Sequence, residues 1–87
     1  MTRPLDPWTA EAKTLVLYRD NGVWRFAIYN DEGIVDGRLD EVDEDAPVEL
    51  AQAELLRRVE EATTRQYEAV WSADKPDWWS ASLTTVV

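Results

Sequence analysis

The chain contains no cysteine and no histidine. Without cysteine, no disulfide, iron–sulfur cluster or thiolate zinc site can stabilise the fold. The two absences together remove the commonest general base, the best metal ligand and the strongest nucleophile, which leaves carboxylates, Ser, Thr and Lys for catalysis. We therefore predict that the protein is not an enzyme and that it holds no cofactor and no metal.

Glycine and long apolar runs are also scarce. The three glycines, Gly22, Gly33 and Gly37, are isolated, whereas a phosphate-binding loop needs a glycine-rich run. No stretch approaches the roughly 20 apolar residues of a membrane span, and residues 1–7 lack the apolar core of a secretory signal. The sequence therefore predicts a cytoplasmic protein without membrane contact.

Charge and length limit the partners and the architecture. Nine basic against eighteen acidic residues give a net charge of −9, which repels nucleic-acid phosphates, and no basic run offsets it. We therefore expect no direct contact with nucleic acid. With 87 residues the chain can bury one core, so we predict a loose N-terminal arm over residues 1–12, pinned by Trp8, and a single domain over residues 13–87.

The first half of the domain has the pattern of a β-hairpin followed by a third strand. Residues 13–19 and 23–30 are β-branched and aromatic runs on either side of Asn21-Gly22, a pair that favours a two-residue turn. This turn predicts that Asp20 pairs with Val23, and that Arg19, Leu17 and Leu15 lie opposite Trp24, Phe26 and Ile28. Residues 34–39 follow as a third strand with Val35 and Leu39 on the Phe26 side, in which Gly37 weakens the strand or marks a bulge.

The second half has the pattern of a helix and another hairpin. Asp45-Ala46-Pro47 predicts a helix start with Pro47 in the first turn, and apolar residues then recur at helical spacing, namely Val48, Ala51, Leu55, Leu56, Val59 and Ala62. Residues 66–72 and 77–87 are strand-like around a turn at Lys75-Pro76. The predicted fold is α+β, with the order β-β-β-α-β-β, a mainly antiparallel sheet and one helix packed on one face.

An acidic loop precedes the helix, and three interpretations of it stay open. One is a site for a hard cation such as calcium or magnesium, although the spacing of the acidic residues does not supply an EF-hand ligand set; these residues are Asp36, Asp40, Glu41, Asp43, Glu44, Asp45 and Glu49. The second is a solvated segment near the positive end of the helix dipole, and the third is a docking patch that steers a basic partner.

Two groups of aromatic residues are candidate binding residues. One face of the first hairpin carries Val16, Tyr18, Arg25, Ala27 and Tyr29, a set too mixed for a core. In the last strand, Trp78 and Trp79 point to opposite faces, so one joins the core and the other needs cover from the sheet edge, the arm or a partner.

The order of strands, then the helix from Val48, then more strands resembles HicB-like antitoxins, whose domains look like a trimmed ribonuclease H fold. The stretch Val48-Glu49-Leu50-Ala51 followed by Leu55-Leu56 carries this resemblance, and Asp43 to Pro47 replaces the glycine-threonine approach to the helix in that family. In composition the chain also resembles small acidic inhibitors carried by phages and mobile elements. The resemblances imply a protein that inhibits a larger, basic, nucleic-acid-binding protein.

Our leading hypothesis is a small acidic protein-binding module, either a homodimer or a domain that docks on a larger protein. An alternative is a small-ligand binder with a tryptophan-lined pocket that contains Trp71, between the helix and the second hairpin. The predicted partner-binding residues are Tyr18, Arg25, Tyr29, Trp78, Trp79, Asp40, Glu41, Asp43 and Glu44.

Overall fold

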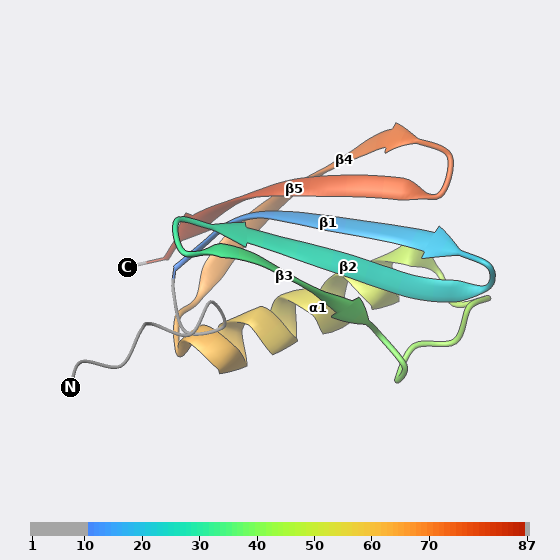
Figure 1. Cartoon of the computed structure of the whole chain (residues 1–87), viewed down its shortest axis with the longest axis horizontal. Coiled ribbons are helices and arrows are strands. Elements are labelled where there is room, and N and C mark those ends of the chain that lie inside the picture. The colour runs from blue at the N-terminus through green and yellow to red at the C-terminus, as the bar shows by residue number, and fades with distance from the viewer. Residues whose placement is uncertain (1–10, 87) are drawn as a thin grey trace.

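A computed structural model describes residues 11–86 as one five-stranded antiparallel sheet with one helix (Figure 1). Its elements are β1 (Ala12–Asp20), β2 (Val23–Asn30), β3 (Gly33–Arg38), α1 (Val48–Thr63), β4 (Tyr67–Lys75) and β5 (Trp78–Thr85). The predicted α+β class and element order are confirmed. Trp8 and most of the predicted arm lie outside the described residues, and Ala12 already belongs to β1. Within residues 11–86, no helix is long and apolar enough to cross a membrane.

The first hairpin has the predicted register. Asn21 and Gly22 adopt positive φ angles of 51° and 74°, as a two-residue turn requires. Asp20 pairs with Val23, and Arg19, Leu17 and Leu15 pair with Trp24, Phe26 and Ile28, so all four predicted pairings are confirmed. Gly37 forms no bulge and instead pairs regularly with Phe26. A Cβ atom at Gly37 would lie 3.1 Å from Cζ of Phe26, so this glycine makes room for the ring.

The sheet has the strand order β3-β2-β1-β5-β4, which places the first strand of the chain next to the last. Thr14 pairs with Ser82 and Tyr18 with Trp78 across this junction. The second hairpin turns at Pro76 and Asp77, one residue later than predicted, because Asp77 takes the positive φ angle of 59° and Lys75 still pairs with Trp78.

Helix α1 begins one residue later than predicted. Pro47 is its N-cap with ψ 145° and not a first-turn residue, and no side chain caps the helix start. Pro47 still supplies the first acceptor, since the Leu50 N–H donates to its carbonyl oxygen at 3.0 Å. The last helical residue is Thr63, and Thr64 is the C-cap with a left-handed conformation and a φ angle of 54°.

The helix covers one face of the sheet, and the core lies between them (Figure 1). Ala51, Leu55 and Val59 of the predicted apolar stripe are buried there. Trp24 is the largest fully buried side chain, and its Nε1–H donates to the Asp43 carbonyl at 2.8 Å. Leu39 follows β3 and is buried as well, with its N–H donating to the Trp24 carbonyl. Within residues 11–86, no helix or strand covers the opposite face, which we call the open face.

Candidate functional site

Three rows of side chains on the open face cross all five strands. Because alternate residues of a strand point to opposite faces, the strand register defines each row. From β3 to β4, the first row is Arg38, Arg25, Tyr18, Trp78 and Lys75. The middle row is Asp36, Ala27, Val16, Ser80 and Ser72. The third row is Ile34, Tyr29, Thr14, Ser82 and Val70.

In the first row, a stacked pair of aromatic rings lies between basic side chains. The rings of Tyr18 and Trp78 are stacked with centroids 4.6 Å apart and planes 21° from parallel. The Lys75 ammonium lies 4.5 Å from the centroid of the Trp78 ring, within the range of a cation–π contact. Arg25 lies beside Tyr18, at 4.0 Å from the Asp20 carboxylate. The row therefore offers rigid aromatic surface flanked by positive charge.

The middle and third rows differ in size and polarity. The middle row is mostly small, with Ala27, Ser80 and Ser72 around Val16. The third row exposes large apolar side chains, since Tyr29 is 40%, Ile34 is 61% and Val70 is 70% exposed. Exposed apolar groups that gather on one face, unlike scattered ones, are typical of an interaction surface.

The open face differs in charge from the rest of the protein. Its three rows hold three basic residues (Arg25, Arg38 and Lys75) and one acidic residue (Asp36), and strand alternation adds Asp20 and Glu68 to the same face, so these six charges sum to zero. The net charge of −9 of the whole chain therefore lies elsewhere. Sequence inspection missed this basic row because its members come from three separate strands.

The predicted binding residues on the sheet fall into two groups. Tyr18, Arg25 and Trp78 lie side by side in the first row, and Tyr29 shares their face in the third row. Trp79 lies on the helix side, where its ring centroid is 5.7 Å from that of Trp24. The structure thus separates the two tryptophans by face, with Trp78 on the open face and Trp79 against the core.

The acidic loop lies beyond β3 and is attached to the body largely through backbone groups. The Asp43 and Glu44 carbonyl oxygens accept hydrogen bonds from Trp24 and Arg19. The carboxylate of Asp40 pairs with Arg38 at 3.4 Å, and that of Glu41 pairs with Arg58 at 3.5 Å. Among residues 11–86, no three carboxylates are grouped so that they could hold a metal ion.

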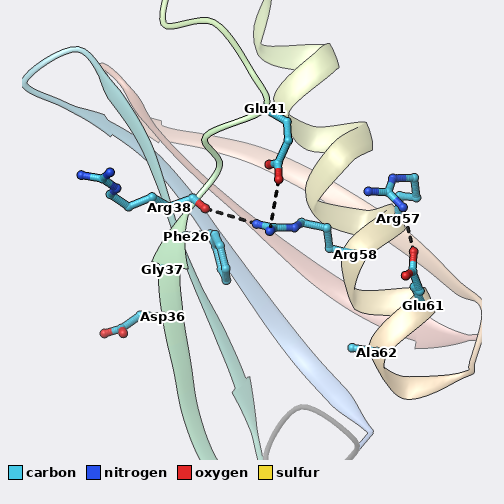
Figure 2. Close-up of a pocket in the computed structure, with 9 residues that line it drawn as sticks. All are labelled: Phe26, Asp36, Gly37, Arg38, Glu41, Arg57, Arg58, Glu61 and Ala62. Carbon is cyan, nitrogen blue, oxygen red and sulfur yellow. Dashed lines mark hydrogen bonds and ion pairs between the residues drawn. The ribbon is translucent and has the colours of Figure 1, made fainter.

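A groove of about 590 Å³ lies between β3 and the second half of α1 (Figure 2). The Phe26 ring and Gly37 lie on its sheet side, and Arg57, Arg58 and Ala62 lie on its helix side. No tryptophan lines this groove, so it is not the predicted pocket around Trp71.

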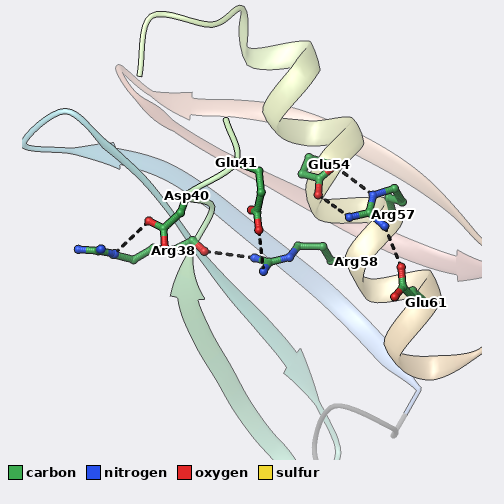
Figure 3. A network of polar contacts seen from close by, with 7 residues as sticks. All are labelled: Arg38, Asp40, Glu41, Glu54, Arg57, Arg58 and Glu61. Carbon is green, nitrogen blue, oxygen red and sulfur yellow. Dashed lines mark hydrogen bonds and ion pairs between the residues drawn. The ribbon is translucent and has the colours of Figure 1, made fainter. Parts of the chain in front are cut away.

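The charges in and around the groove are paired with one another (Figure 3). Arg57 contacts Glu54 at 2.7 Å and Glu61 at 2.8 Å. The hydrogen bond to Glu54 raises the pKa of Arg57 and lowers that of Glu54. Arg58 contacts Glu41 and donates to the Arg38 carbonyl at 3.2 Å. Because these pairs compensate one another, the groove presents little unbalanced charge to a ligand, and the open face is the stronger candidate site.

Comparisons with known protein families, with curated proteins and with solved structures find no match to this chain. The likeness to HicB-like antitoxins and to phage inhibitors therefore stays a prediction.

Proposed function

We propose that this protein is a small, acidic, non-enzymatic protein-binding module that self-associates through its open face. The observation that carries the proposal is a sheet face with stacked aromatic and exposed apolar side chains that none of the elements in residues 11–86 covers. Tyr18 and Trp78 are its anchors, because their mutual stacking holds both rings in place before a partner arrives. A cytoplasmic location is part of the same proposal.

The charge distribution favours a second copy of the chain as the occupant. Two surfaces that each carry a share of −9 repel one another, so self-association through the rest of the molecule is disfavoured. Two open faces whose charges sum to zero meet with far less repulsion, and their basic side chains have long apolar stems that can pack.

The area of the open face determines how tightly we expect two copies to associate. Five strands at about 4.8 Å spacing give a width of roughly 24 Å, and five residues along each strand give a height of roughly 17 Å. A footprint of about 400 Å² on each copy, or about 800 Å² in total, lies below the range of stable interfaces and fits a weak, reversible complex. We therefore expect a dimer that dissociates in the micromolar range.

The experiment is light scattering over a concentration series, at low and high salt. The native chain should rise from one to two chain masses with concentration, and the dimer should persist at high salt because the contact is mainly apolar. Val16→Glu is the main test variant, since Val16 sits in the middle row on the central strand and any face-to-face contact covers it. We expect this variant to weaken association about tenfold or more.

Two further variants make the test specific. Leu50→Glu is the matched control, because Leu50 is 59% exposed on α1 and the substitution adds the same charge away from the sheet. Tyr18→Ala should weaken association without unfolding the domain, which keeps the test valid if Val16→Glu folds poorly. A native chain that stays monomeric at every concentration, or equal effects of Val16→Glu and Leu50→Glu, would contradict self-association and favour a foreign partner.

A further inference from the structure

We infer that the two copies pack face to face about a two-fold axis that runs along the middle row, across the strands. The inference rests on the proposed self-association and adds which residues of the second copy each row contacts. It follows from two independent properties, namely the sizes of the rows of the open face and the position of the acidic loop.

The geometry of aligned sheets leaves two axes to compare. Both copies present the same face, so the axis must lie in the plane between the two sheets. In an aligned packing the strands of the two sheets stay within about 30° of each other, so the axis runs either along the strands or across them. An axis along the strands places each row over itself, with β2 over β5 and β3 over β4. An axis across the strands places each strand over its own copy and the first row over the third.

Side-chain size favours the axis across the strands. It places Tyr18 opposite Thr14 of the second copy, and Trp78 opposite Ser82 of the second copy, so each bulky anchor meets a small residue. The small middle row then meets itself, with Val16 against Val16. The axis along the strands instead stacks Tyr18 on Tyr18 on the central strand, whereas the middle row meets itself in either case. Facing surfaces pack to native density when large and small residues alternate across them.

Charge within the face does not separate the two axes. Along the strands, Arg38 of one copy would lie opposite Lys75 of the other, and across the strands Asp36 lies opposite Asp36, so each axis brings one kind of like charge together. Across the strands, Arg25 lies opposite Tyr29 of the second copy, where a cation–π contact can form, as it can with Trp78 along the strands. The axis across the strands also places the stems of Arg38 and Lys75 over Ile34 and Val70, the most exposed apolar side chains of the face.

The acidic loop gives the second argument. Hydrogen bonds from Arg19 to Glu44 and Asp77 place this loop at the first-row end of the sheet, near the β1–β2 and β4–β5 turns. An axis along the strands would bring the acidic ends of both copies to the same end of the dimer. An axis across the strands places them at opposite ends, where their mutual repulsion is screened over a longer distance.

Single-cysteine cross-linking tests the arrangement, because the native chain has no cysteine. Ala27 and Ser80 are middle-row residues on β2 and β5, with β1 between them. We expect Ala27→Cys alone and Ser80→Cys alone each to form a covalent dimer with a short bis-maleimide, because each residue faces its own copy. Ala53→Cys, on the exposed side of α1, is the control for random collisions and should stay uncross-linked.

The outcomes separate this inference from the proposed function. If a covalent dimer forms only when Ala27→Cys and Ser80→Cys are mixed, the axis runs along the strands; the arrangement is then wrong although self-association stands. If light scattering shows a dimer and none of these variants cross-links above the control, the face-to-face contact is refuted. A chain that is monomeric by light scattering refutes both proposals.

Discussion

Replacement of Arg19 by methionine should destabilise the fold more than the same replacement of Arg57 on the surface of α1. Arg19 connects three segments that are distant in sequence: its guanidinium contacts the Asp77 carboxylate at 2.7 and 3.1 Å and donates to the Glu44 carbonyl at 3.1 Å. Its guanidinium carbon also lies 4.7 Å from the centroid of the Trp24 ring. Methionine keeps much of the apolar stem and removes all of these polar contacts.

The expected loss follows from the individual contacts. A hydrogen bond to a backbone carbonyl contributes about 1 kcal/mol, and an exposed ion pair such as Arg19–Asp77 contributes roughly 0.2–1 kcal/mol. The contact with the Trp24 ring adds about 0.5–1 kcal/mol. The sum is about 2 kcal/mol, which corresponds to a decrease in Tm of about 8–16 °C for a domain of this size.

The assay is thermal and urea unfolding followed by tryptophan fluorescence, at concentrations where the chain is monomeric. The control is Arg57→Met: Arg57 also contacts two carboxylates, but its side chain is 58% exposed and both partners lie on its own helix. We expect the control to lower the Tm much less than Arg19→Met does, because exposed pairs within one helix contribute little. A Tm for Arg19→Met within about 2 °C of the native value would refute the assignment of Arg19 as a connection between segments.

Two further predictions concern packing and acid stability. Gly37→Ala should lower stability by about 1 kcal/mol, because crowding against the buried Phe26 ring outweighs the roughly 0.4–1 kcal/mol gained by restricting the unfolded chain; a raised Tm would show that the ring gives way. The hydrogen bond from Arg57 lowers the pKa of Glu54, so its ion pair stabilises the fold at neutral pH and this contribution is lost as pH falls through the lowered pKa. The urea midpoints of the native chain and Glu54→Gln should therefore converge in acid, and a pH-independent difference would contradict this role.

The sequence predicts those parts of the fold that local rules determine. The Asn21-Gly22 turn fixes the register of β1 and β2, because a two-residue loop leaves one way to pair the flanking strands. From that register the mixed face around Tyr18 follows directly. The helical spacing of Ala51, Leu55 and Val59 similarly predicts which side of α1 is buried.

The rest of the site depends on pairing between distant segments. No turn connects β1 to β5, so no local signal indicates that Tyr18 meets Trp78 or that Lys75 extends the first row. Because no local signal pairs β5 with β1, the sequence does not show which of Trp78 and Trp79 faces the core. The alternation of side chains along a strand correctly puts them on opposite sides. Pro47 shows the limit of local rules at element ends, where a shift of one residue changes a first-turn residue into an N-cap.

The adjacency of β1 and β5 also has a consequence for the kinetics of folding. The three hairpin turns each contain two residues and can close within microseconds. The pair Thr14 and Ser82 at one end of the β1–β5 ladder is separated by 68 positions (82 minus 14), and closing a loop of that length costs about 3–4 kcal/mol of chain entropy. We therefore expect the barrier to folding at the meeting of the β1-β2-β3 unit with the β4-β5 hairpin, with α1 as the connection that shortens the search.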